Sequence, residues 1–405
     1  MPPSTILEQC LAEVFSQMHR ATVNVVLKAV LALSNGGWLT MTEMARHWPG
    51  AQRVAAPLKA VDRLLSSARL RGYRAQMYGG LTRWLIRQSR PLIVVDWSDL
   101  KADGRFRLLR AGLAVEGRTL TLYEEVHPRA RSGQAEVEAA FVRALAAMLP
   151  SDCRPIVITD AGFRTPWFRA VRNMGWHYVG RVRGTVKVQR VDDPSSSSWT
   201  LCATLHRQAP RDGTREMGAY QLGQRAMLRT RLIVHKAPRK GRHAKTVTGR
   251  ARRDGVSRKA ARSAREPWLL ATSLSREEAT TRCVVNLYAR RMRIEESFRD
   301  LKSGDLGAGL EHSRTAKCER LAHLLVLFAL AQLAAWLMGW CEEERGEGGR
   351  LEARNTTRRT HHSLWRLGKE VIQRETWWPS NRHLRDFLRR AARGAPPRLC
   401  TAMEG

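Results

Sequence analysis

The sequence predicts a mixed α/β protein with helical sections at both ends of the chain. Three observations lead to this fold class. Strand-like runs alternate with helical patterns from Pro91 to about Gly184, in the order βββαβαβ. Helical periodicity dominates before about Arg90 and returns after about Thr315. With 405 residues and 43% hydrophobic content, the chain can form two or three domains with ordinary cores, which excludes a basic disordered tail protein.

The charge balance points to a polyanionic partner. Lys and Arg number 70 and Asp and Glu number 37, so the formal net charge is +33. Such a charge opposes a compact state by self-repulsion unless a polyanion neutralises it. Small acidic substrates do not require so much charge. Nucleic acid is therefore the expected partner before any motif is considered.

Cysteine usage and hydropathy indicate the compartment. The seven cysteines include no C-x-x-C pair, which argues against a disulfide framework and a Cys-based zinc site and favours a reducing cytosol. The first residues carry no signal-peptide pattern. The longest apolar run, Leu324–Trp340, has 17 residues, whereas a membrane span needs about 20. We therefore expect a buried or subunit-contact helix there.

The N-terminal section reads as helices over 21–33, 41–47 and 56–66, with Thr40 or Thr42 as a candidate cap. A short helix, a Pro-Gly break and a third helix give the outline of a helix-turn-helix unit. Lys59 and Arg63 lie four residues apart on one face of the third helix and are candidate DNA contacts. A helical bundle with a solvated basic face fits the same pattern.

The central section starts with three strands, over 92–95, 106–115 and 118–126, and Glu116-Gly117 suits a tight hairpin turn. A helix over 134–149 follows, then a strand over 156–158. Thr165-Pro166 opens a second helix, with Thr165 as the expected cap, and a strand follows over 177–182.

The composition changes over residues 185–266. A strand is expected at 228–234, and 236–265 then holds 12 Lys and Arg against one acid, Asp254. This run is either an electrostatic arm on DNA or a solvated basic loop, and the global charge favours the arm. A strand over 268–272, a long helix over 283–303 and a helical C-terminal section complete the chain, which ends in a basic segment at 382–398.

Two carboxylates end apolar runs that follow a proline: Asp96 in P-L-I-V-V-D and Asp160 in P-I-V-I-T-D. A carboxylate at the end of a buried strand must be hydrogen-bonded, capped or metal-bound. Taken singly, each is better explained as the cap of the following turn. Two such strands in one sheet, however, can bring the carboxylates together, where a divalent cation relieves their repulsion.

The long helix carries a polar stripe. Seven residues complete about two helical turns, so Tyr288, Glu295 and Lys302 share one stripe, with Arg291 close to it. The stripe suits a metal ligand flanked by phosphate-binding groups. A solvated face with ion pairs such as Arg291–Glu295 is the alternative.

These four residues match a known signature. The chain resembles the bacterial DDE transposases of cut-and-paste insertion sequences, in the group whose third acidic residue lies in a Y-x2-R-x3-E-x6-K motif. The resemblance covers the chain from the N-terminal helices to about residue 375. It implies an RNase H-like catalytic core over 91–184 and 267–314, interrupted by a mainly β insertion at 185–266. It also implies a helical DNA-end-binding domain at 1–90 and a helical dimerisation region at 315–405.

By this resemblance, Asp96, Asp160 and Glu295 are the catalytic carboxylates and hold two Mg²⁺ ions, with Mn²⁺ as a substitute. Hard carboxylate oxygens suit both ions. Asp99 and Glu296 are the neighbours most easily mistaken for ligands, and Glu296 lies about 100° around the helix from Glu295.

The resemblance also assigns DNA contacts. Tyr288, Arg291 and Lys302 would bind phosphates, Arg bidentately and Lys as a point charge. Trp268 would stack on a base flipped out near the transposon end, although a Trp at a strand start is more often a core residue. The expected partners are transposon ends and target DNA, bound by a homodimer at the bacterial nucleoid in the cytoplasm, with no membrane.

The function that follows is cut-and-paste transposition by nicking, hairpin formation and strand transfer. A non-cleaving DNA-binding repressor of the same element is the alternative, although an intact acidic triad argues against it. An RNase H-like nuclease without strand transfer is less compatible with the basic insertion and the Y-R-E-K stripe.

Overall fold

The computed structural model describes residues 3–191, 198–237, 266–305, 307–346, 363–374 and 378–394. By its internal contacts the chain divides into two compact units. Unit 1 comprises Met1–Pro155 and Met292–Thr401, and unit 2 comprises Ile156–Arg291 and Ala402–Gly405. The basic run 236–265 lies outside the described residues, apart from its first two positions.

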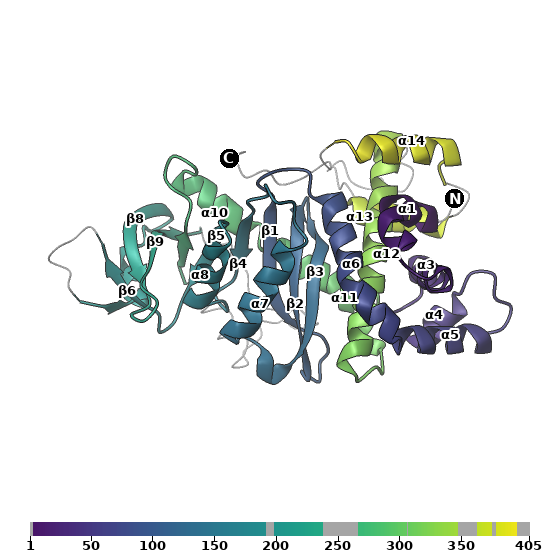
Figure 1. Ribbon diagram of the computed structural model, residues 1–405. Helices are drawn as coiled ribbons and strands as arrows, with labels where there is room; N and C mark the ends of the chain where they lie inside the picture. The colour runs from purple at the N-terminus through teal and green to yellow at the C-terminus, as the bar shows by residue number, and fades with distance from the viewer. Residues whose placement is uncertain are drawn as a thin grey trace, which may run out of the picture. The chain divides into compact units, whose positions relative to one another are not determined.

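Unit 1 contains an antiparallel sheet in the order β3-β2-β1, built from β1 (Leu92–Asp99), β2 (Phe106–Val115) and β3 (Arg118–Pro128). The predicted turn joins β2 to β3, with Gly117 at φ 74°, a left-handed conformation that favours glycine. One face of the sheet packs against α7 (Ala135–Ala146), where Phe141 stacks on Tyr123. β3 also packs against α6, α11 and α12 (Figure 1).

The N-terminal helices belong to unit 1. They are α1 (Pro3–Cys10), α2 (Ala12–Ser16), α3 (Arg20–Ser34), α4 (Met41–Arg46), α5 (Ala55–Leu65) and α6 (Ala68–Leu85). The three predicted helices correspond to α3, α4 and α5. Thr40, not Thr42, caps α4, because its hydroxyl accepts a hydrogen bond of 3.2 Å from the Glu43 amide.

The predicted apolar helix is the central helix of unit 1. α12 (Cys318–Glu344) is buried along nearly all of its length, against α1, α3, α6, α13 and β3 (Figure 1). It is the one helix of the described residues that is long and apolar enough to cross a membrane, but 89% of its most apolar window is buried within the fold. The expectation of a buried helix is confirmed.

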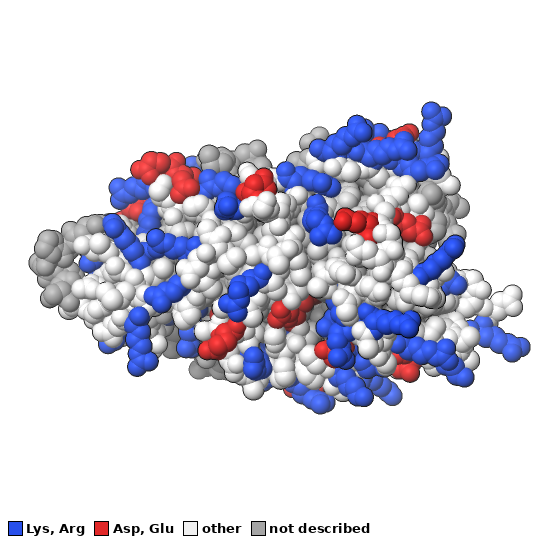
Figure 2. All heavy atoms as spheres, viewed as in Figure 1, with Lys and Arg blue, Asp and Glu red and all other residues white. Residues whose placement is uncertain are grey.

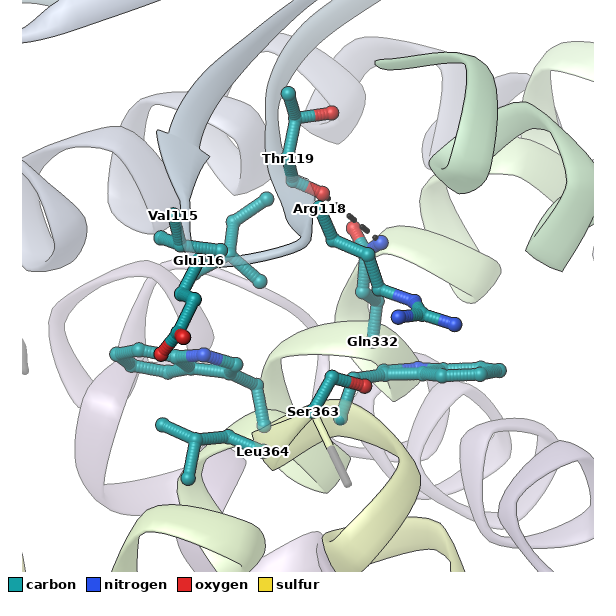
Figure 3. A pocket seen from close by; sticks show the side chains of 10 residues that line it. Val115, Glu116, Arg118, Thr119, Gln332, Ser363 and Leu364 are labelled. Carbon is teal, nitrogen blue, oxygen red and sulfur yellow. Dashed lines mark hydrogen bonds between the residues drawn. The ribbon is translucent and has the colours of Figure 1, made fainter. Parts of the chain in front are cut away.

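Two further helices pack on α12. They are α13 (Leu364–Gln373) and α14 (Asn381–Ala391). Gly339 and Gly368 allow the backbones of α12 and α13 to touch, since a Cβ at Gly368 would overlap the Ala335 carbonyl. α12 also bonds to the sheet, because the side-chain amide of Gln332 donates to the carbonyl of Thr119 in β3 at 3.3 Å (Figure 3). The small cavity there, about 10 Å³, holds at most one water and is a packing gap, not a substrate pocket.

Unit 2 contains a sheet in the order β4-β5-β10-β9-β8-β6-β7. Its strands are β4 (Ile156–Thr159), β5 (His177–Val182), β6 (Lys187–Arg190), β7 (Thr200–Leu201), β8 (Gly213–Leu222), β9 (Leu228–Lys236) and β10 (Trp268–Thr272). β4 and β5 are parallel and are connected by α8 (Thr165–Asn173), and the strands beyond β5 pair antiparallel.

The α/β class is confirmed, and the order of the elements is the one expected for the predicted RNase H-like core. An antiparallel three-strand start is followed by the parallel β4-α8-β5 unit, and β6 to β9 form the mainly β insertion. Two local expectations are wrong. Arg164, not Thr165, is the N-cap residue of α8, and Thr165 lies in its first turn.

The second correction concerns the long helix. The segment forms two helices, α10 (Thr281–Ala289) and α11 (Met292–Lys302), separated by a turn at Arg290 and Arg291. The turn residues are good helix formers, so local propensity does not explain the break. The amides of Arg290 and Arg291 donate to carbonyls only three residues back, at 3.2 and 3.0 Å. The predicted stripe therefore persists only from Glu295 to Lys302.

Candidate active site

Asp96 lies in β1 with 6% of its surface exposed. Its neighbour Trp97 points to the α7 face, because its indole N–H donates to Glu138 at 3.0 Å. Side chains alternate along a strand, so Asp96 and Ser98 point to the opposite face. The Trp97 amide also donates to Oδ1 of Asp96 at 2.8 Å, which leaves Oδ2 outside this local bond.

The same face of β1 meets α11. Nζ of Lys302 donates to Oγ of Ser98 at 2.7 Å, two residues from Asp96. Glu295 is exposed and lies on the stripe of Lys302, two turns earlier in α11. Unit 1 thus places Lys302 on the side of the sheet to which Asp96 points, with Glu295 on the same stripe of α11 as Lys302.

Burial lowers the pKa of Lys302, and the charges of Asp99, Glu311 and Glu295 oppose this shift. The ammonium lies 5.6 Å from the centre of the Phe298 ring, a cation–π distance. Lys302 is therefore held at the strand end by a hydroxyl and a ring, with its charge only partly compensated. This is a suitable arrangement for a group that binds phosphate.

The two neighbouring acids have other partners. Asp99 is exposed and lies 3.4 Å from Arg107 and 3.3 Å from Arg129. Glu296 pairs with Arg299 at 2.8 Å on the surface of α11. Both side chains thus take part in ordinary surface ion pairs.

A buried ion pair lies beside Asp96, and the sequence reasoning missed it. Across the strands, Asp96 is opposite Arg110, and Arg110 is opposite Glu124. Arg110 is fully buried and its Nε donates to Glu124 at 2.7 Å, while the Tyr78 hydroxyl donates to Glu124 at 3.0 Å. The guanidinium lies 5.3 Å from the Phe298 ring of α11. The sequence signal that could have predicted this ion pair is the presence of Arg110 and Glu124 inside two mainly apolar strands.

In unit 2, Asp160 directly follows β4 and is half-buried. Its Oδ1 accepts a hydrogen bond of 2.7 Å from the Gly162 amide. This is the turn cap that the sequence left open as an alternative. It occupies one carboxylate oxygen and does not exclude a ligand on the other.

Tyr288, at the end of α10, is 4% exposed. Burial raises its pKa, Arg291 and Arg181 oppose that shift, and the Asp160 charge adds to it. Trp268 packs edge-on against Tyr288, with ring centres 4.9 Å apart, and against His235 at 5.4 Å. Unit 2 thus places Tyr288 between Trp268 and charged groups that include Arg291 and Asp160.

Two predicted contacts lie elsewhere. Lys59 and Arg63 are exposed on α5, as expected for a solvent-facing or DNA-facing stripe.

In the part of the chain that the structure describes, no group of three or more His, Cys, Asp or Glu side chains is arranged to hold a metal ion. Lys and Arg are spread over the surface and gather over α14 and around α4 to α6 (Figure 2).

Comparisons with known proteins give one family. A protein-family model described as the transposase DDE domain matches residues 87–332, more than half of the chain. No curated protein matches. Among solved structures, the chain is similar to the piggyBac transposase in a cryo-EM structure of its synaptic complex with hairpin DNA. That likeness has 8% identity and a TM-score of 0.42, and covers 96% of this chain and 82% of that chain.

Proposed function

The chain belongs to the DDE transposase family, and from this premise we propose that it is a cut-and-paste transposase. It would bind the terminal inverted repeats of its element, excise the element and join its 3′-OH ends to target DNA. The observation that carries the proposal is the family match over residues 87–332. Enzymes of this family act on DNA and depend on divalent metal ions.

We propose Asp96, Asp160 and Glu295 as the metal ligands. Their donor chemistry fits, because three carboxylates offer the hard oxygens that Mg²⁺ and Mn²⁺ prefer. The shared side of Asp96 and Glu295 in unit 1 and the single capped oxygen of Asp160 support this set. Two bound ions would supply charge neutralisation at phosphorus and activation of the attacking oxygen.

The remaining roles belong to side chains that touch DNA. Lys302, held by Ser98, would bind a phosphate beside Asp96. Arg291 and Tyr288 would orient the strand on the side of Asp160, since Tyr288 is buried and bound to Arg291. Charged donors of this kind fix phosphate positions without reading sequence.

The proposed reaction has four steps at one site. Water nicks one strand at each end, and the freed 3′-OH attacks the opposite strand to form a hairpin. Water then opens the hairpin, and the 3′-OH attacks target DNA. Each step exchanges one oxygen on phosphorus for another, so no protein nucleophile is needed.

A closer resemblance supports the hairpin route. The stretches V-D-W-S-D at 95–99, E-P-W at 266–268 and H-S-R-T at 312–315 resemble the transposase of the insertion sequence that flanks a composite tetracycline-resistance transposon. By that resemblance, we propose a bacterial protein that acts at the nucleoid as a homodimer on DNA, through its C-terminal helices. The alternative, a non-cleaving repressor, retains DNA binding without the carboxylate chemistry.

Alanine variants of the three carboxylates test the proposal. On linear duplexes carrying the inverted repeats that flank the gene, Asp96→Ala, Asp160→Ala and Glu295→Ala should each lose nicking, hairpin formation and strand transfer but keep end binding. Glu296→Ala is the matched control, because it removes a surface carboxylate one residue away, and it should remain active. Wild-type protein that binds the ends but never cleaves with Mg²⁺ or Mn²⁺ would support the repressor instead.

A further inference from the structure

Unit 1 contains a groove away from the predicted carboxylates. It lies between the segment from Trp38 to Glu43, which leads into α4, and the segment from His312 to Arg320, which leads into α12. Its volume is about 720 Å³. We name it the Trp38 groove.

A fixed aromatic pair forms one wall. The rings of Trp38 and His312 are stacked with centres 4.4 Å apart and an angle of 17°. Gly309 lies against Trp38 at φ 62°, and a Cβ there would come within 2.7 Å of Cγ of Trp38. A Cβ at Gly304 would overlap the His312 ring. Because neither glycine carries a Cβ, both rings fit closely against the backbone at this point. Trp38 still has 36% of its surface exposed.

The opposite wall is the backbone segment from Ser313 to Lys317, called the strap, which Lys101 fixes by hydrogen bonds. Nζ of Lys101 donates to the carbonyls of Ser313 and Thr315, the second at 2.7 Å. Arg314 and Lys317 of this strap are exposed and line the groove. Neither side chain makes a hydrogen bond or ion pair with another residue among those the structure describes.

The other charges of the groove are already compensated. Glu43 binds Arg46 at 2.7 Å, and Arg320 binds Asp62 at 2.8 Å. The field in the groove therefore comes from Arg314 and Lys317. No side chain caps the N-terminus of α12, but Glu319 in its first turn offsets the positive end of the helix dipole.

We propose that the Trp38 groove binds the sugar–phosphate backbone of the transposon-end DNA. Arg314 and Lys317 bind phosphates, and the Trp38–His312 pair contacts the sugar and base edge between them. This inference rests on the proposed function and adds to it a binding site.

Two features favour DNA over a free nucleotide or an acidic peptide. The groove is open and has two uncompensated cations, as a polyanion that continues past the site requires. The groove also borders α5, because Arg320 binds Asp62 on this helix, which carries the exposed Lys59 and Arg63. Backbone contacts from cations and a ring are typical of strand binding without sequence readout.

The test measures binding without catalysis. The double variant Arg314→Gln/Lys317→Gln is compared with wild type by fluorescence anisotropy on end duplexes in EDTA, over a range of salt. Each lost phosphate contact reduces the slope of log K against log salt by about 0.9, so the double variant should lose about 1.8. The matched control Arg385→Gln/Arg389→Gln removes two exposed arginines from α14 and should leave the slope unchanged.

Hydroxyl-radical footprinting tests the ring pair. Trp38→Ala should lose protection of one or two sugars on the end duplex, and Trp38→Phe should retain it. Thermal melts establish that each variant is folded, and the charge variants do not alter the packed rings. An unchanged slope with an unchanged footprint overturns the groove while the proposed function stands. Wild-type protein that binds no end duplex overturns both.

Discussion

Trp268 has two possible roles: it packs against neighbouring rings in the fold, and in the proposed hairpin reaction it would stack on a flipped base. It is half-buried between His235 and Tyr288, with ring centres 5.4 and 4.9 Å away. Each aromatic contact contributes about 0.5–1.5 kcal/mol beyond the area buried, so the two contacts give roughly 1–3 kcal/mol and Trp268→Ala should lower the unfolding free energy by at least that much. The same ring, stacked on a flipped base, would contribute about 1–3 kcal/mol to hairpin closure.

The two effects separate in a rate measurement. A loss of about 1–3 kcal/mol in one step slows it by about 5- to 150-fold. We expect Trp268→Ala, once corrected for its folded fraction, to nick end duplexes normally and to accumulate nicked product because the hairpin step is slow. Pre-nicked duplexes isolate that step, and an abasic nucleotide at the flipped position should partly restore it. Trp268→Phe is the control, because it keeps a ring against Tyr288.

One result would refute the base-flipping role. If nicking and hairpin formation fall by the same factor, in proportion to the folded fraction, then Trp268 acts only through packing. The abasic substrate would then give no rescue. The partial exposure of Trp268 makes both outcomes physically accessible.

Two further predictions address Lys302 and the helix crossing. Because burial lowers the pKa of Lys302, its ammonium loses its proton at a lower pH than that of an ordinary lysine. Lys302→Arg should therefore move the alkaline fall of the nicking rate to higher pH, since arginine keeps its charge. If the alkaline fall stays at the same pH, the charge at this position is not used in nicking. Gly368→Ala forces a methyl into the α12 backbone and should lower the unfolding free energy in urea by about 1–3 kcal/mol. Gly72→Ala is its control, since nothing lies within 4 Å there and helix propensity alone should add up to about 1 kcal/mol.

Strands were the best predicted elements because their signals are local. β2, β5 and β10 have the predicted bounds, since each is an apolar run between turn-forming residues. α6 was not predicted, because Gly72, Gly79 and Gly80 weaken its helical pattern. Gly80 allows α6 to pack closely against Leu11, because a Cβ at this position would come within 2.7 Å of the Leu11 side chain. Only the tertiary structure reveals that requirement.

The sequence is enough to propose the candidate carboxylates, but it does not predict their surroundings. Strand ends and helix spacing indicated Asp96 and Glu295. The break before Met292 was not predictable, because Arg290 and Arg291 are ordinary helix residues. The stacking of Trp38 on His312 joins positions far apart in the chain, and no periodicity in a sequence reports such a contact.

The burial of α12 has a consequence for the order in which the protein is made. Helices α1, α3, α5 and α6 pack on it, yet α6 ends at Leu85 and α12 begins at Cys318. At about 5–20 residues per second, a ribosome takes roughly 10–50 s to span that interval. During this time the apolar sides of the N-terminal helices lack their native cover. A chain that terminates before α12 therefore lacks the helix on which its N-terminal helices pack.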